Sequence, residues 1–232
     1  MPQISVIIPA YNEELSIGKV VAGISRELVQ EVIVVDNNSS DATGQVAATA
    51  GATVLKELRQ GYGQACLTGI AHAIRQTPPP EIILFMDGDY SDYPEEIPLL
   101  LEPILRQNFD MVIGSRALGR REPGSMTAPQ VFGNWLATTL LQVLYKAHFT
   151  DLGPFRAIRT QALLQLNMQD RTYGWTVEMQ LKAAQQKLRY TEVPVTYRKR
   201  IGVSKISGTV KGVVLAGHKI LWTIGKLYFK KR

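Results

Sequence analysis

The chain has 232 residues, of which 45% are hydrophobic and 20% charged, a composition typical of a globular protein and not of a disordered or fibrous one. Its single cysteine, Cys66, excludes an intramolecular disulfide, is typical of a reducing cytosolic setting, and lies in an Ala/Leu-rich run that predicts a core position. The net charge of +6 gathers in RALGRREPG, YRKRIGVSK and KLYFKKR, which indicates anionic partners.

The first half of the chain alternates between β-branched runs and helical patterns. Helices are expected between successive strands, and Asp41 is the expected N-cap of the second one, with Gly51 as its C-terminal stop. This alternation predicts a mostly parallel sheet covered by helices on both faces. The predicted strands are 4–10, 31–39, 52–58, 81–89 and 110–116.

The pattern changes after residue 116. A loop rich in Gly and Pro is followed by a helix at 131–147, an irregular piece at 150–159, a helix at 175–187, a strand at 188–197 and a final helix. We expect one domain over 1–206, with a nucleotide-sugar-binding half (1–116) and an acceptor half (117–206), followed by a basic amphipathic helix at 207–232. Neither a secretory leader nor a run of about 18 uncharged apolar residues is found, so a spanning helix is not expected.

Polar residues follow four of the predicted strands. In open α/β sheets, ligands bind beyond the carboxyl ends of the strands, so this edge is the expected ligand site. The residues concerned are Pro9, Tyr11, Asn12 and Glu13; Asp36, Asn37 and Asn38; Asp87 and Asp89; and Ser115 and Arg116.

The Asp87-Gly-Asp89 turn predicts a site for Mg²⁺ or Mn²⁺. These ions prefer oxygen ligands and commonly leave positions for substrate phosphates, and a divalent ion relieves the repulsion between the two carboxylates. A solvated acidic turn is the alternative, since Asp-Gly is common in turns, but the preceding apolar strand and Asp36 favour the metal. A calcium loop is excluded because Asp92 and Pro98 occupy the positions that require Gly and Glu.

Five stretches, SVIIPAYNEE, VIVVDNNSSDAT, GYGQACLTGI, LFMDGDYSDYPEEI and DMVIGSR, resemble the successive motifs of family 2 glycosyltransferases. The resemblance covers about residues 3–206 and is strongest to the polyprenyl-phosphate glycosyltransferase branch, which includes dolichyl-phosphate mannose synthase. It implies the GT-A fold, a nucleotide-diphosphate sugar donor, a divalent metal, and inverting transfer to a polyprenyl phosphate in the cytoplasm, at the inner face of the membrane.

The resemblance also implies roles for individual residues. Pro9, Tyr11 and Glu13 would line the nucleotide pocket, and Asp36 would hold the base or ribose. Gly61 and Gln64 would border the nucleotide. Asp87 and Asp89 would form the metal-binding DXD motif, with Asp89 the more direct ligand, and Arg116 would meet the acceptor phosphate. Arg156, Arg200, Ser204 and Lys205 would donate to phosphate oxygens. Pro154 departs from the family pattern and leaves the alignment of Asp151 open.

Glu178 has two interpretations. Many inverting family members use an acid from this region as a base, but a phosphate acceptor is already anionic near neutral pH, so Glu178 could instead orient Arg116 or Arg156.

The final helix has two interpretations as well. Lysines beside Leu215, Trp222 and Phe229 are typical of a helix lying on anionic lipid, and a core-packing helix with a wet basic side would show the same pattern.

Other functions are compatible with parts of the same sequence. A glycosyltransferase acting on another lipid or a soluble hydroxyl would need Glu178 or another acid as base. A nucleotidyltransferase would carry a Gly-rich loop with a lysine near the N-terminus, which is missing, and a non-catalytic nucleotide-sugar binder is a further alternative. Cys66 stands where a dinucleotide-binding loop has its third glycine, which argues against a dehydrogenase. The acidic strand ends argue against a nucleic-acid partner.

Overall fold

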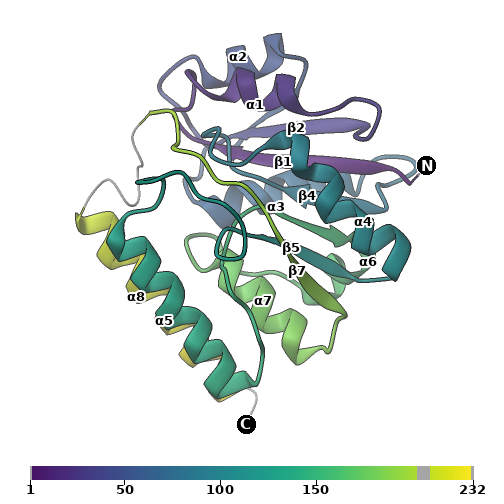
Figure 1. Ribbon diagram of the computed structural model, residues 1–232. Coiled ribbons are helices and arrows are strands. Elements are labelled where there is room, and N and C mark those ends of the chain that lie inside the picture. The colour runs from purple at the N-terminus through teal and green to yellow at the C-terminus, as the bar shows by residue number, and fades with distance from the viewer. Residues whose placement is uncertain (1, 203–209, 231–232) are drawn as a thin grey trace.

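Seven strands form one sheet in the computed structural model, which describes residues 2–202 and 210–230 (Figure 1). The strand order is β3-β2-β1-β4-β6-β5-β7. β6 is antiparallel to both of its neighbours, and every other pairing is parallel, which confirms the mostly parallel sheet. The strands are β1 (Ile4–Ala10), β2 (Glu31–Asp36), β3 (Thr53–Lys56), β4 (Ile82–Phe85), β5 (Met111–Ser115), β6 (Arg156–Arg159) and β7 (Tyr190–Pro194).

Helices cover both faces of the sheet, and side-chain alternation along the strands explains how. Ile7 and Phe85 pack with one set of helices, whereas Val6 and Leu84 pack with the other. The first set comprises α3 (Tyr62–Ala73), α5 (Ala128–Tyr145), α6 (Thr160–Leu166), α7 (Trp175–Gln185) and α8 (Val210–Lys230). The second comprises α1 (Ile17–Gly23), α2 (Thr43–Thr49) and α4 (Ile97–Gln107), the last preceded by a 3₁₀ turn, Pro94–Glu96.

The boundaries of α2 follow from local chemistry. The N-cap is Ala42 and not the expected Asp41, whose Oδ1 atom accepts the amide of Thr43 at 3.0 Å from one residue earlier. Gly51, just after the C-cap Ala50, has a φ of 93°, which few residues other than glycine adopt, and ends the helix as expected. α5 begins with a capping box, in which Thr127 and Gln130 each accept the other's amide.

The prediction of an irregular piece at 150–159 is wrong. Its last four residues form β6, which is inserted between β4 and β5 so that both halves of the chain share one sheet. The RAIR segment has an arginine at each end. Arg156 is nevertheless fully buried, because its guanidinium donates to the backbone carbonyls of Gly153, Leu152 and Thr176.

α8 packs against α5 and α7 beside the main sheet, and α5 and α8 lie side by side in Figure 1. Ile224 is 2% exposed, and the Tyr145 hydroxyl donates to its carbonyl at 2.6 Å. The expected C-terminal amphipathic helix is therefore present and packs on the core. Among the described helices, we find none whose length and apolar character would let it cross a membrane.

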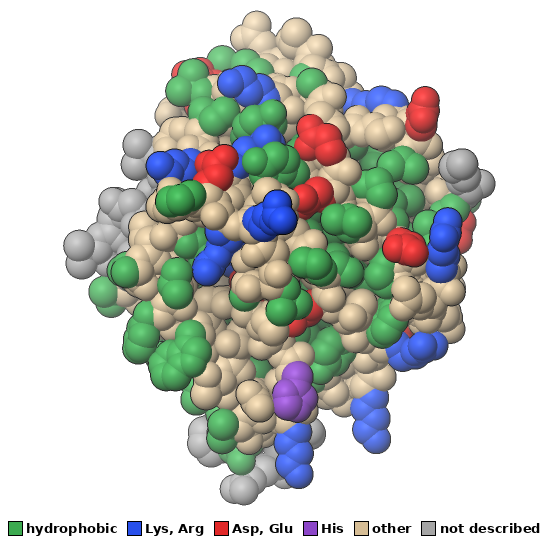
Figure 2. Space-filling model, viewed as in Figure 1, with side chains coloured by type: hydrophobic (Ala, Val, Ile, Leu, Met, Phe, Trp, Pro, Cys, Tyr) green, Lys and Arg blue, Asp and Glu red, His purple; other side chains and the backbone are tan. Residues whose placement is uncertain are grey.

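Both helices of this pair carry exposed apolar side chains. Figure 2 shows hydrophobic side chains at the surface in the region of α5. The exposed apolar residues are Val131, Phe132, Trp135 and Val143 on α5, and Val214, Leu215, Leu221 and Trp222 on α8. The two interpretations of the final helix are thus compatible, because one side packs on the core and another presents apolar residues to the surroundings.

Candidate active site

A buried acidic turn follows β4. Asp89 and Asp92 are 5% and 1% exposed, and within the described residues the Oδ1 atom of Asp87 and both carboxylate oxygens of Asp92 lack hydrogen-bond partners. Burial, followed by the charge of Asp89, raises the pKa of Asp87 to about 7. Burial, followed by the charges of Asp87 and Asp89, raises the pKa of Asp92 well above its ordinary value. The described part of the chain therefore supplies too few hydrogen-bond donors for the carboxylate oxygens of this turn.

Arg200 joins this turn to the first strand. Its Nη1 lies 3.1 Å from Asp89 Oδ2, and its Nη2 lies 2.7 Å from Glu13 Oε1. The other oxygen of Asp89, Oδ1, accepts the amide of Ser91 at 2.9 Å and its hydroxyl at 2.5 Å. One guanidinium is therefore shared between two carboxylates that follow the neighbouring strands β1 and β4.

The basic stretch after β7 lies along the acidic turn. The amide of Ile201 donates to the Asp89 carbonyl at 2.9 Å, and the amide of Arg198 donates to the Ser91 carbonyl at 3.0 Å. The Arg198 guanidinium lies 3.3 Å from the centre of the Tyr90 ring and donates to the Asp92 carbonyl at 3.1 Å. These contacts hold the backbone of the turn in place, and with it the positions of its carboxylates.

The donor set of the turn fits a hard divalent cation. Asp87 offers a buried oxygen without a partner, and Asp89 directs an oxygen at a positive charge. In the described part of the chain, no three His, Cys, Asp or Glu side chains meet in a way that would hold a metal by themselves. A cation here would complete its shell with waters or substrate oxygens, as Mg²⁺ commonly does with phosphates.

Arg116, at the end of β5, is held by Asp151. Asp151 Oδ2 accepts the Arg116 Nε at 2.7 Å and its amide at 2.8 Å, and Oδ1 accepts Nη2 at 2.6 Å. Burial opposes the charge of Arg116, and Asp151 outweighs it, so the pKa of Arg116 is raised above its ordinary value. The guanidinium lies 5.0 Å from the Tyr197 ring centre, in the segment that borders the acidic turn. Arg116 is therefore a fixed cation beside that turn.

The ends of β1 and β2 are tied together. The amide of Asn12 donates to Ser39 Oγ at 3.0 Å, and Asn12 Oδ1 accepts the amide of Ser40 at 2.8 Å. Asp36 Oδ1 accepts the amide of Ser39 at 2.9 Å, which closes a turn at the end of β2. Pro9 and Tyr11 are half-buried at the adjoining end of β1. The edge expected from the sequence therefore exists as a set of neighbouring loops.

The glycines of the GYG motif make a close contact, and its partner is protein. A Cβ on Gly61 or Gly63 would collide with the backbone of Asp170 and Arg171. Gln64 is engaged as well, because its side chain accepts Arg171 Nη1 at 2.7 Å and donates to Glu57 at 2.9 Å. The close approach that these glycines allow is therefore to the segment before α7, and a place for Gly61 and Gln64 beside a nucleotide stays a prediction.

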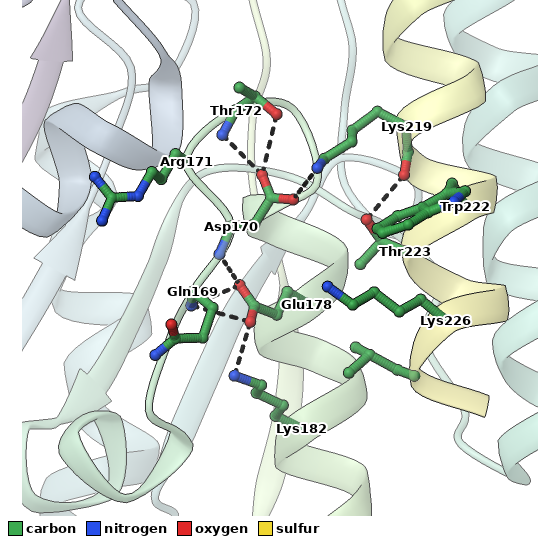
Figure 3. Close-up of a pocket in the computed structure, with 11 residues that line it drawn as sticks. Gln169, Asp170, Arg171, Thr172, Glu178, Lys182, Lys219, Trp222, Thr223 and Lys226 are labelled. Carbon is green, nitrogen blue, oxygen red and sulfur yellow. Dashed lines mark hydrogen bonds and ion pairs between the residues drawn. The ribbon is translucent and has the colours of Figure 1, made fainter. Parts of the chain in front are cut away.

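One candidate is buried among backbone carbonyls, one lies in a separate pocket, and two are outside the described residues. Arg156 pairs across the sheet with Phe85, two residues before Asp87, and its guanidinium donates to backbone carbonyls. The Glu178 carboxylate accepts the amides of Gln169 and Asp170 and pairs with Lys182 at 2.7 Å, in a separate pocket (Figure 3). The candidates outside the described residues are Ser204 and Lys205.

Sequence reasoning assigned no role to Asp92 or Asp151. Asp92 was visible as the third carboxylate in six residues, and an acid so close to a buried strand was the available signal. Asp151 carried no such signal, because its pairing with Arg116 spans 35 residues and depends on where β6 enters the sheet.

Solved structures share this architecture. Glucosyl-3-phosphoglycerate synthase from Mycobacterium tuberculosis, determined in complex with Mn²⁺, UDP and glucosyl-3-phosphoglycerate, matches with a TM-score of 0.76 at 22% sequence identity. The match covers 97% of this chain and 80% of that chain. The mostly parallel seven-stranded sheet with helices on both faces therefore has the GT-A fold.

Sequence comparison gives the family. Residues 5–166 match the model of glycosyl transferase family 2. An undecaprenyl-phosphate mannosyltransferase of Micrococcus luteus is 30% identical over 89% of this chain and 88% of that protein. A dolichyl-phosphate hexose transferase of Haloferax volcanii is 30% identical over 91% and 90%. An uncharacterised glycosyltransferase of Mycobacterium tuberculosis is 35% identical over 92% and 94%. The chain belongs to glycosyl transferase family 2.

Proposed function

We propose that this enzyme transfers a hexosyl group, with inversion, from a nucleotide-diphosphate sugar to a polyprenyl phosphate. The observation that carries the proposal is the buried acidic turn at the edge of the sheet, flanked by the cations Arg200 and Arg116. The names of two relatives that share about 30% of its residues over nearly the whole chain support a polyprenyl-phosphate acceptor.

The donor would bind at the acidic turn. Asp89, with Asp87 beside it, would hold Mg²⁺ or Mn²⁺, which supplies Lewis-acid neutralisation of the diphosphate leaving group. The loops after β1 and β2, with Pro9, Tyr11 and Asp36, would receive the nucleoside. Arg200 already lies against Asp89 and would offer its donors to the phosphate oxygens once a donor is present.

The acceptor would approach from the side of Arg116. Asp151 occupies Nε and Nη2, which leaves Nη1 to donate to an acceptor phosphate. An oxygen of that phosphate attacks the anomeric carbon from the face opposite the diphosphate, and the bond between this carbon and the diphosphate oxygen breaks as the nucleoside diphosphate leaves. The attacking oxygen is already anionic, so the step needs no base, which is consistent with Glu178 lying elsewhere.

A lipid acceptor requires contact with a bilayer. The exposed apolar residues of α5 and α8, together with the basic C-terminal sequence, support a peripheral attachment at the cytoplasmic face.

Transfer assays with alternative acceptors test the proposal. Purified enzyme, a radiolabelled donor and Mn²⁺ would be incubated with undecaprenyl phosphate, with undecaprenol, or with 3-phosphoglycerate. We expect label in a mild-acid-labile lipid product with undecaprenyl phosphate alone. Transfer to undecaprenol would place a hydroxyl acceptor and a catalytic base in the site, and transfer to 3-phosphoglycerate would replace the lipid by a soluble phosphate acceptor.

A further inference from the structure

A cationic pocket, separate from the acidic turn, lies between α7, α8 and the segment 169–172 (Figure 3). Its volume is about 290 Å³, and it shares no lining residue with the acidic turn. Four basic and two acidic side chains line it: Arg171, Lys182, Lys219 and Lys226, and Asp170 and Glu178. The lining therefore has an excess of positive charge.

The two acids are already engaged by the protein backbone. Asp170 Oδ1 accepts the amides of Thr172 and Gly174 at 2.7 and 3.1 Å, and Glu178 accepts the amides of Gln169 and Asp170. Each acid also pairs with one lysine, at 2.9 Å for Lys219 and 2.7 Å for Lys182. These hydrogen bonds and ion pairs hold the segment 169–172 in place and occupy the oxygens of both carboxylates. Little negative charge is therefore left to neutralise the other basic side chains of the pocket.

Of the two lining cations without a carboxylate partner in the described chain, Arg171 donates to Gln64 Oε1 at 2.7 Å, which leaves Lys226. It extends from α8 into the space facing α7 (Figure 3), and no carboxylate of the described chain pairs with it. Its ammonium lies 4.9 Å from the centre of the Trp222 ring, and that of Lys219 lies 5.4 Å from the same centre. The indole, which is 50% exposed, therefore holds two ammonium groups at the mouth of the pocket.

We propose that this pocket is a second anion site that binds a phosphate mono- or diester group. Lysines act as point charges for phosphate, and a space of this size is at the lower limit of ligand pockets, so it suits a single phosphorylated head group and not a whole nucleotide sugar. Trp222, which lines the pocket and is half exposed, would lie against the organic part of the ester. The site is independent of the transfer reaction proposed above.

The indole N–H signals in a ¹H–¹⁵N spectrum provide a local test, because the chain has three tryptophans and only Trp222 lines the pocket. The probes are inorganic phosphate and sn-glycerol 3-phosphate, added at constant ionic strength. We expect the Trp222 signal to shift in a saturable way, and the dissociation constant to rise about tenfold in Lys226→Gln. Lys187→Gln, at an exposed lysine outside the pocket, should match the wild type.

Vesicles distinguish the two sources of the phosphate group. The full-length protein would be co-sedimented with phosphatidylcholine vesicles and with vesicles that also contain phosphatidylglycerol. A lipid head group is the ligand if only the anionic vesicles bind, in a Lys226-dependent way, and a soluble ester is the ligand if only the small phosphates shift Trp222. The proposal is overturned if neither probe binds, or if Lys226→Gln binds both as the wild type does. Melting temperature and nucleotide binding of each variant would show that the fold and donor site are intact.

Discussion

The guanidinium of Arg200 lies 2.7 Å from the carboxylate of Glu13, although 187 residues separate them in the chain. The same guanidinium lies 3.1 Å from Asp89. The last described loop before α8 therefore contacts the residues that follow β1 and β4. A donor diphosphate and its metal would compete for these partners, which makes Arg200 a direct probe of the donor site.

Replacing Arg200 should weaken donor binding. In Arg200→Gln we expect the dissociation constant of the nucleotide sugar to rise about 10- to 100-fold, because a hydrogen bond to a charged group contributes about 1.5–3 kcal/mol. Isothermal titration in the presence of Mn²⁺ measures this, and Arg106→Gln on the exposed surface of α4 is the charge-matched control. Equal affinity in the Arg200 and Arg106 variants would remove Arg200 from the donor site.

Arg116 and Asp151 should separate acceptor recognition from donor binding. Arg116→Lys keeps the charge and loses the two-pronged geometry, so kcat/KM for the lipid phosphate should fall by about tenfold or more while donor affinity stays the same. Steady-state kinetics at varied acceptor concentration measure this change. A parallel loss of donor affinity would show that Arg116 serves the nucleotide instead.

Removing Asp151 should act mainly on stability. Asp151→Asn leaves the buried Arg116 without its counter-charge, and we expect the free energy of unfolding to fall by about 3–5 kcal/mol in urea denaturation. A loss below about 1 kcal/mol would mean that the pair is solvated and worth no more than a surface ion pair.

The sequence predicted the parallel strands and the edge at which their polar ends meet, because both depend on local patterns. Runs such as IILFMD show a buried strand and its polar end within a few residues. β6 was missed for a physical reason, since a four-residue strand with an arginine at each end has no apolar pattern, and Arg156 is buried only because carbonyls from three other residues surround it. Glu178 was misplaced for a similar reason, because its partners are backbone amides of a segment nine residues earlier, which no pattern reveals.

The glycines at the start of α3 give a stability test of the contact with 170–171. Gly63→Ala would press a methyl group into the backbone of Asp170 and Arg171, so we expect a loss of about 1–3 kcal/mol. Gly133 on α5 has nothing within 4 Å of an added Cβ, and Ala there should stabilise by up to about 1 kcal/mol. If both variants unfold at the same urea concentration, the close approach at Gly63 does not exist.

α8 should prove to be part of the core. Ile224→Ala should lower the free energy of unfolding by about 2–5 kcal/mol, whereas Leu221→Ala, on the exposed side of the same helix, should change it by less than about 0.5 kcal/mol. Equal effects of the two substitutions in urea denaturation would mean that α8 is not docked through Ile224.

The central claim is that Asp89 and a divalent ion together hold the diphosphate of a nucleotide sugar. A thermal-shift panel of UDP-, GDP- and CDP-sugars, each with and without Mn²⁺, tests it most directly in the wild type, in Asp89→Asn, and in Glu95→Gln as an exposed-carboxylate control. We predict that at least one donor stabilises the wild type and the control only when Mn²⁺ is present, and that Asp89→Asn shows no metal-dependent shift. A donor that stabilises Asp89→Asn as strongly as the wild type, or equally with and without Mn²⁺, would contradict the account.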